Sequence, residues 1–141
     1  MSTEEENKAA IRRLGVEVFN KGNLAVIDEL IATNYVAHGP GGQEFKGPEG
    51  VKQLVTVLRT AFPDIHTKID DMVAEGDMVA IRFTYQGTFK GEYMGMAPTG
   101  KQFTFTEAVF HRMEGGRQVE VWSYFDQLSF YQQLGVSPPS Q

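Results

Sequence analysis

Two ionisable side chains stand where a predicted strand should carry apolar ones. Residues 101–113 alternate as a strand, and Glu107 and His111 fall on the same face as Phe103 and Val109. A carboxyl group surrounded by apolar side chains has a raised pKa, because burial disfavours its charged form. A pKa near neutrality is what a general acid or base needs. Glu107 and His111 are therefore the first candidates for acid–base chemistry.

The next predicted strand, at about 117–125, carries a second set of polar groups. One face of this strand and the residue after it hold Glu120, Trp122, Tyr124 and Asp126. A hairpin at 114–117 that pairs the two strands symmetrically, give or take a bulge, places Glu107 near Tyr124 and His111 near Glu120. These side chains would then line one wall of a common cavity.

Each candidate also has a structural interpretation. Asp126 precedes a short helical pattern and could simply cap that helix, a role that aspartate fills well. Glu107 could pair with Arg82 across the sheet, and His111 could be half exposed near a strand end. The aromatic side chains of the last strand could be ordinary core packing. The sequence leaves these alternatives open.

Further candidates lie in the loops. His38 ends the stretch 35–38 and precedes a glycine-rich loop at 39–47, which it could simply anchor. Residues 86–100 form a long connection, and connections of this length are often functional. Tyr93, Met94 and Met96 predict a mobile apolar lid there, although methionines also serve as gap fillers in a core.

Composition excludes several chemistries. The 141-residue chain has no cysteine, which removes disulfides, thiolate metal sites and a thiol nucleophile. Its three histidines lack metal-ligand spacing, and there is no Gly-x-Ser-x-Gly elbow, P-loop or dinucleotide fingerprint. A net charge of -5 with scattered basic residues disfavours nucleic acid. No apolar run approaches the roughly 20 residues of a membrane span. We expect a soluble, cytoplasmic protein.

The elements that must position these groups fall into two halves. Apolar residues at helical spacing predict three N-terminal helices, over about 4–21, 23–31 and 48–62. From residue 65 the period changes to two, which predicts four antiparallel strands and then a short helix that Gly135 ends. This order predicts an α+β fold in which a curved sheet wraps a conical pocket. We expect one domain over 1–141, with a core at about 5–136 and a frayed tail at 137–141.

Short motifs spread over most of the chain form a specific combination. They are Asn34–His38, Phe62–Asp64, Gly91, Met94-Gly95, Pro98–Lys101, Val119–Trp122, Asp126 and Gln132–Gly135. The combination resembles the SnoaL-like polyketide cyclase (ester cyclase) branch of the NTF2-like superfamily. The resemblance implies an NTF2-like cone with an internal pocket, and neither a metal nor an organic cofactor.

The resemblance also implies roles for individual residues. In the family cyclases an aspartate at the end of the last strand takes an α-proton from a polyketide ester, and the enolate closes a ring by intramolecular aldol attack. That aspartate corresponds to Asp126, and His111 would hold or polarise the carbonyl group. The pocket would be shaped by His38, Trp122 and Tyr124. Many relatives have a histidine where this chain has Phe89, which implies a more apolar pocket here.

A homodimer formed by the sheet faces is a further implication of the resemblance. The outer face of the last two strands is predicted to hold Thr104, Thr106, Ala108, Phe110, Val119, Val121 and Phe125. An apolar patch of that size is uncommon on a monomer.

Functions of different classes fit these observations. The first is a cofactor-independent cyclase, or a related lyase or isomerase, acting on an apolar carbonyl compound. A non-catalytic, dimeric small-molecule-binding protein would keep the same pocket. An epoxide hydrolase or hydroxylase on the same fold would need two acids and an arginine around a water, for which Asp71 and Arg82 are the obvious candidates.

Overall fold

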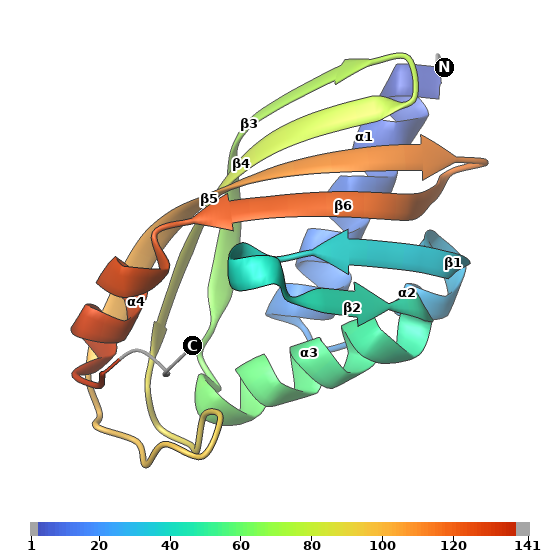
Figure 1. Ribbon diagram of the computed structural model, residues 1–141. Coiled ribbons are helices and arrows are strands. Elements are labelled where there is room, and N and C mark those ends of the chain that lie inside the picture. The colour runs from blue at the N-terminus through green and yellow to red at the C-terminus, as the bar shows by residue number, and fades with distance from the viewer. Residues whose placement is uncertain (1–2, 138–141) are drawn as a thin grey trace.

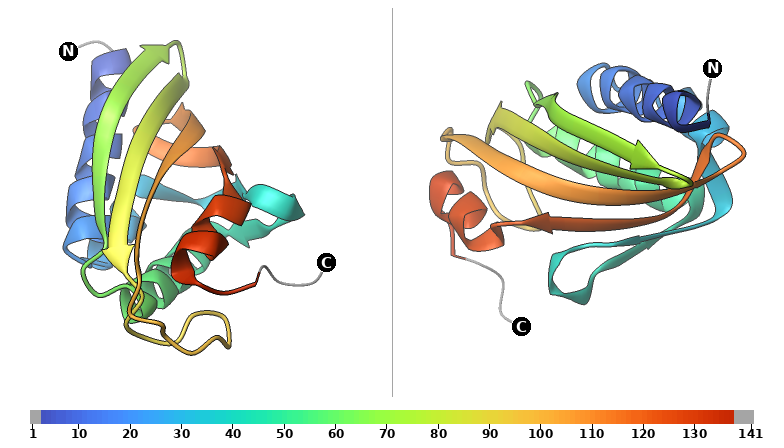
Figure 2. Two further views of the ribbon diagram at one scale, coloured as in Figure 1. Left: turned by 90° about the vertical axis from the view of Figure 1, so that its left-hand side faces the viewer. Right: turned by 90° about the horizontal axis from the view of Figure 1, so that it is seen from above.

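The computed structural model describes residues 3–137, which form one six-stranded sheet with helices packed against it. The strand order is β2-β1-β6-β5-β4-β3, and neighbouring strands are antiparallel except for the parallel pair β1 and β6. The sheet curves strongly and the helices fill part of its hollow (Figures 1 and 2). This architecture is the predicted α+β, NTF2-like cone.

The helical half comprises α1 (Thr3–Leu14), a π-helical turn η1 (Gly15–Asn20), α2 (Ala25–Leu30) and α3 (Gly47–Ala61). The apolar stripes predicted from the sequence face the sheet, and Ile11 of α1 and Val55 of α3 are at most 1% exposed. The predicted first helix therefore exists, but it changes from α to π geometry at Gly15. Pro48 lies in the first turn of α3, where its missing N–H costs no hydrogen bond.

Two strands occupy a region where the sequence pattern predicts a helix end and a loop. They are β1 (Ile31–His38) and β2 (Glu44–Lys46), separated by the 3-10 turn η2 (Pro40–Gly42). β1 pairs with β6, which lies near the other end of the chain. Because this distant pairing holds β1 in the sheet, β1 needs no alternation of apolar and polar residues that the sequence would reveal. The prediction of four strands is therefore corrected to six.

The meander consists of β3 (His66–Glu75), β4 (Met78–Thr88), β5 (Gln102–Glu114) and β6 (Arg117–Phe125). Next to the β5–β6 turn the predicted register holds, since Met113 pairs with Gln118. A β-bulge then leaves Val119 without a partner, and Arg112 pairs with Glu120. Because side chains alternate between faces, this one-residue shift turns the rest of β6 to the face opposite the predicted one.

The last helix, α4 (Gln127–Leu134), packs against β5 and ends at Gly135 in the left-handed conformation, as predicted. Phe130 of α4 joins an aromatic cluster in which its ring centroid lies 5.1 Å from that of Phe103. No helix within residues 3–137 is long and apolar enough to cross a membrane. Of the predicted frayed tail, residues 138–141 lie outside the described part of the chain.

Candidate active site

A cavity of about 520 Å³ lies between the sheet and the helices. Its exposed lining residues Gln43, Val57 and Met94 mark the mouth, and its buried lining residues Ile11 and Val121 mark the closed end. The volume is typical of small-molecule sites, which measure about 300–1,000 Å³. Within the described residues, neither lysine nor arginine lines it, and most of the wall is aliphatic or aromatic. Such a wall favours neutral, apolar ligands.

Glu107 stands midway along this wall. β5 turns it inwards, opposite Phe83 of β4 and Phe125 of β6. Part of its side chain faces the cavity, while protein surrounds the carboxyl group on the other sides. Desolvation raises the pKa of Glu107 from 4.5 to about 7, and a hydrogen bond from Tyr85 opposes this only in part. The predicted apolar environment of Glu107 is thus confirmed.

Two tyrosines flank this carboxyl group. Tyr85 comes from β4 and Tyr35 from β1, and both line the cavity and are at most 9% exposed. Burial, together with the nearby charge of Glu107, raises the pKa of both phenols above their ordinary value of 10. Both hydroxyls therefore remain protonated at neutral pH and can donate hydrogen bonds. We call Glu107, Tyr35 and Tyr85 the acid centre.

A second polar group lies at the closed end of the cavity. His111 is 5% exposed and the neighbouring Gln118 is 2% exposed, and both line the cavity. Burial lowers the pKa of His111 to about 4, against a smaller opposing effect of the Gln118 side chain. Four residues separate His111 from Glu107 along β5, which corresponds to about 13 Å. His111 therefore does not share a reacting centre with Glu107.

Asp126 lies outside the cavity. It is exposed, and its carboxylate accepts a hydrogen bond from the backbone N–H of Ser129 at 3.0 Å, which caps α4. The predicted burial of Asp126 against cavity aromatics is wrong, and the capping interpretation is confirmed. His111 pairs with Val121, five residues before Asp126, so about 16 Å of strand separates the two predicted catalytic residues. A catalytic role for Asp126 stays a prediction.

Trp122 and Tyr124 are not in the cavity wall either. The bulge at Val119 turns both to the outer face of the sheet, where Tyr124 is 59% exposed. Beyond the bulge, the β6 residues that line the cavity are Val121, Ser123 and Phe125. The predicted pocket wall is wrong because it assumed an unbroken register.

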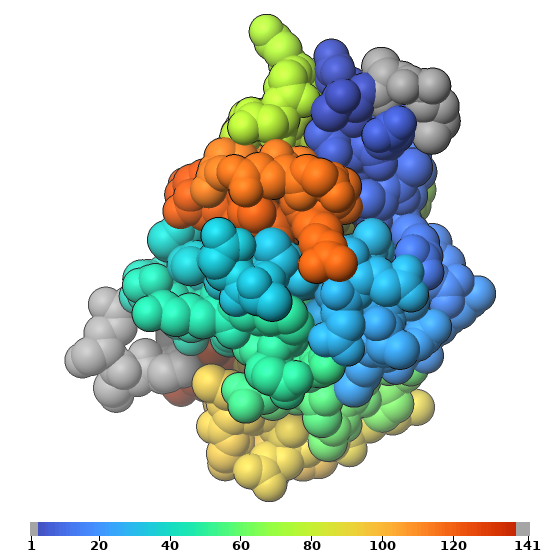
Figure 3. All heavy atoms as spheres, turned by 90° about the vertical axis from the view of Figure 1, so that its right-hand side faces the viewer, coloured from blue at the N-terminus to red at the C-terminus, as the bar shows by residue number. Residues whose placement is uncertain are grey.

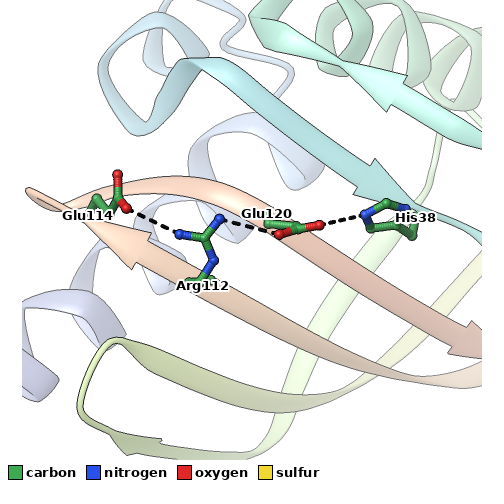
Figure 4. Close-up of polar contacts among 4 residues, drawn as sticks. All are labelled: His38, Arg112, Glu114 and Glu120. Carbon is green, nitrogen blue, oxygen red and sulfur yellow. Dashed lines mark hydrogen bonds and ion pairs between the residues drawn. The ribbon is translucent and has the colours of Figure 1, made fainter.

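His38 also lies on the outer face (Figure 4). Its Nε2 is 2.8 Å from a carboxylate oxygen of Glu120, and its ring stacks on Trp122 with centroids 5.7 Å apart. Arg112 binds the other oxygen of Glu120 at 3.3 Å and Glu114 at 3.1 Å. Contacts with His38, and then with Arg112, lower the pKa of Glu120. His38 thus belongs to an outer-face network, and its predicted place in the pocket is wrong.

The three residues of the β4–β5 connection that were predicted to contact the ligand lie in different environments. Met94 lines the mouth and is 61% exposed. Phe89 is fully buried in the core, where its ring lies 5.7 Å from that of Phe62. Met96 is bridged to Tyr93 and packs against the core without lining the cavity. The predicted ligand contacts at Phe89 and Met96 are therefore corrected to packing.

Several polar cavity residues were not among the sequence-based candidates: Tyr35, Tyr85, Gln118 and Ser123. The sequence pattern could have identified Tyr85, because alternate residues of β4, Tyr85 among them, lie on the same inner face of the sheet as Glu107. Tyr35 sits on a strand that local periodicity does not reveal. Gln118 lies before the bulge, on the face of β6 that the pattern predicts to be inward, and was not singled out, whereas the inward position of Ser123 depends on the bulge.

The acid and arginine considered for epoxide hydrolysis lie away from the cavity. Arg82 and Asp71 form an ion pair between β4 and β3 with both side chains largely exposed. Within residues 3–137, no three His, Cys, Asp or Glu side chains gather in a way that could hold a metal ion.

An α+β cone that encloses an apolar cavity, with a carboxyl group buried in its wall, defines a small-molecule site of the NTF2-like class. The sequence model of the SnoaL-like polyketide cyclase family matches residues 9–134. The chain belongs to this family.

Individual relatives extend over nearly the whole chain. The aklanonic acid methyl ester cyclase AcmA of Streptomyces galilaeus is 30% identical over 139 residues, which cover 95% of this chain and 94% of that protein. The cyclase of the same description from Streptomyces peucetius, DnrD, is 29% identical over 133 residues, covering 92% and 91%.

Solved structures give the same result. IdmH of Streptomyces antibioticus, described as a candidate polyketide cyclase, has a TM-score of 0.79 and 35% identity, covering 92% of this chain and 99% of its own. A protein from Jannaschia, described as a candidate SnoaL-like polyketide cyclase, shares the fold with a TM-score of 0.88 at 21% identity, covering 98% of both chains.

Proposed function

We propose that this protein is a cofactor-independent cyclase that closes a ring in a neutral, polyketide-like ester by intramolecular aldol attack. The observation that carries the proposal is the acid centre, in which a carboxyl group with a pKa of about 7 lies beside two tyrosine hydroxyls in an apolar cavity. Membership of the SnoaL-like family supports ring closure. The names of the curated relatives support an ester as substrate.

Glu107 acts first, as the base. Its carboxylate takes the proton from a carbon flanked by two carbonyl groups, and the C–H electron pair becomes an enolate. The hydroxyl of Tyr35 donates a hydrogen bond to the oxygen on which the negative charge develops, and the hydroxyl of Tyr85, released from the Glu107 carboxylate once Glu107 is protonated, can donate to the same oxygen.

Ring closure then returns the proton. The enolate carbon attacks a ketone carbon of the same molecule, so that a C–C bond forms and the ketone oxygen becomes an alkoxide. The alkoxide takes the proton from the carboxylic acid of Glu107, and the carboxylate is regenerated. No electrons or protons are consumed, so the reaction needs no cofactor.

The charge of the cavity selects the substrate. A free acid would bring a second carboxylate beside Glu107, and the described lining supplies no lysine or arginine to balance it. Aklanonic acid methyl ester is therefore the first compound to test, with aklanonic acid as the charged counterpart. The ester should bind and react, and the acid should do so much more weakly.

Two variants test which carboxylate is the base. Glu107→Gln keeps the size of the side chain and should lower the rate of ring closure by about 10²–10⁴-fold, the range expected when a general base is removed. Asp126→Asn retains most of the capping ability and should react at nearly the wild-type rate. Product formation in single-turnover reactions measures both.

The wild-type rate should rise with pH through about 7, as Glu107 loses its proton. A large loss in Asp126→Asn with wild-type turnover in Glu107→Gln would transfer the role of base to Asp126. If neither the ester nor simpler neutral β-ketoesters show faster α-proton exchange with the protein, the non-catalytic binding protein is the better description.

We also propose that the protein acts as a cytoplasmic homodimer. The support for a dimer is the outer face of the sheet, where Phe110 is 45% and Tyr124 59% exposed.

A further inference from the structure

The closed end of the cavity holds polar groups that the proposed reaction does not use. We call His111 and Gln118 the distal pair. The Gln118 side chain interacts with the His111 ring as a weak hydrogen-bond partner, but neither ring nitrogen of His111, nor Nε2 of Gln118, makes a hydrogen bond of good geometry within residues 3–137, although both side chains are more than nine-tenths buried. Buried polar groups in folded proteins are almost always satisfied. An unsatisfied pair that lines a cavity therefore indicates a partner that enters the cavity.

The sheet neighbours of the distal pair supply no polar side chain. His111 lies between Val79 of β4 and Val121 of β6 in the sheet, and Gln118 is opposite Ile31 of β1. Figure 3 faces the end of the molecule at which α1, β1 and the β5–β6 hairpin lie side by side. The bulge beside Gln118 leaves two successive residues of β6, Gln118 and Val119, buried, so the Gln118 amide lies among apolar neighbours.

We infer that the distal pair is a binding subsite for a neutral oxygen of the ligand, a hydroxyl or a carbonyl, about 13 Å along β5 from Glu107. A neutral imidazole offers one N–H donor and one acceptor, and the Gln118 amide adds two N–H donors. The inference rests on the proposed function and deepens it. The substrate is an elongated neutral molecule with a reacting ketoester near Glu107 and a second oxygen at its far end.

Two probes of one shape test the subsite. 4,4′-Dihydroxybiphenyl has a hydroxyl at each end of a rigid apolar body, and 4-hydroxybiphenyl has one. Calorimetric titration of wild-type protein should show the diol binding about three- to tenfold more tightly, the range of one or two net hydrogen bonds. The preference should fall to about one in Gln118→Met and in His111→Phe, while the affinity for the mono-hydroxy compound is retained.

Gln86→Met is the matched control, because it makes the same change on the exposed outer face of β4. It should keep the diol preference. Nitrogen-15 spectra give an independent readout: the diol should shift the ring resonances of His111, and the mono-hydroxy compound should not. His38 on the outer face and the exposed His66 serve as internal references.

The outcomes separate this inference from the proposed function. An equal affinity of wild-type protein for both probes, or an unchanged preference in Gln118→Met and His111→Phe, would mean that the pair holds only an ordered water, and the subsite would be overturned. Wild-type turnover in Glu107→Gln would overturn the proposed base and leave the diol preference intact. Failure of both probes to bind would overturn the cavity as a ligand site and the subsite with it.

Discussion

Glu107 and His111 lie on one face of β5, and burial shifts their ionisation in opposite directions. Desolvation favours the uncharged form of each, so the pKa of the acid rises to about 7 and the pKa of the base falls to about 4. Between about pH 4.5 and 6.5 both groups are charged in the unfolded chain and uncharged in the folded protein. Folding therefore binds one proton at Glu107 and releases one at His111, and their effects on stability oppose each other.

Single variants should reveal the two opposed effects. Between pH 4.5 and 7, Glu107 is protonated in the folded protein but not in the unfolded chain, so the free energy of unfolding falls as the pH rises. Between pH 4 and 6.5, His111 is protonated in the unfolded chain but not in the folded protein, so the free energy of unfolding rises with pH. Each slope is about 1.4 kcal/mol per pH unit. From pH 4.5 to 6.5, the free energy of unfolding of Glu107→Gln should rise relative to wild type by about 2–3 kcal/mol, and that of His111→Phe should fall by as much.

Urea unfolding at three pH values across this window measures these slopes. His66→Gln and Glu92→Gln, on exposed positions, are the controls and should follow the wild-type profile. Parallel profiles for all five proteins would show that the two buried groups do not titrate as their burial requires.

The connection at 89–101 is held at its stem by backbone hydrogen bonds, and its tip is a turn closed by the bridge between Tyr93 and Met96. The N–H groups of Lys90 and Gly91 both donate to the carbonyl oxygen of Ala61, at 2.9 and 3.0 Å. At the tip, Met94 is exposed and adopts a positive φ of 52°, which is unfavourable for a residue with a side chain. The mobility of the predicted lid stays a prediction.

Gly91→Ala should loosen this stem. A Cβ at this position would lie 2.1 Å from the carbonyl oxygen of Thr60, so either the connection or the end of α3 must move. We expect a loss of about 1–3 kcal/mol in the free energy of unfolding. Amide exchange at Lys90 and Gly91 should accelerate, and ligands should bind more weakly as Met94 leaves the mouth.

Gly95→Ala is the comparison variant in the same connection. A Cβ there meets nothing within 4 Å, although the φ of +82° costs about 1–2 kcal/mol. It should leave the amide exchange of Lys90 and Gly91 unchanged. Unaltered exchange at these amides in Gly91→Ala would contradict the role assigned to the stem.

At the scale of the whole molecule, the outer sheet face is the candidate dimer surface. Phe110 of β5 and Tyr124 of β6 are exposed there and their rings meet edge to face, with centroids 6.5 Å apart. Of the predicted members of this surface, Val121 and Phe125 line the cavity instead because of the bulge, and Val119 is buried. Their places are taken by Trp122 and Tyr124, so the surface keeps apolar area while its composition changes.

Tyr124→Lys should dissociate the proposed homodimer. Light scattering of the wild-type protein at micromolar concentration should give twice the chain mass of 15.7 kDa, and the variant should give the chain mass. A charge placed at a buried aromatic contact should weaken association by about 100-fold. Val16→Lys changes another exposed apolar residue, on η1, and should remain dimeric. A wild-type mass near 16 kDa would contradict the dimer.

Local patterning determined the elements and the principal ionisable group. The change from helical to strand period at residue 65 predicted the α+β class. Alternation along 101–113 placed Glu107 among apolar neighbours, because successive side chains of a strand point to opposite faces of the sheet. Which side chains meet across the sheet was decided by tertiary structure. β1 exists because it pairs with a distant strand, and one bulge at Val119 exchanged Trp122 and Tyr124 for Ser123 and Phe125 in the cavity. Side chains of a strand alternate between the two faces of the sheet. A single unpaired residue, which does not alter the pattern of the sequence, is therefore enough to turn the residues after it to the opposite faces.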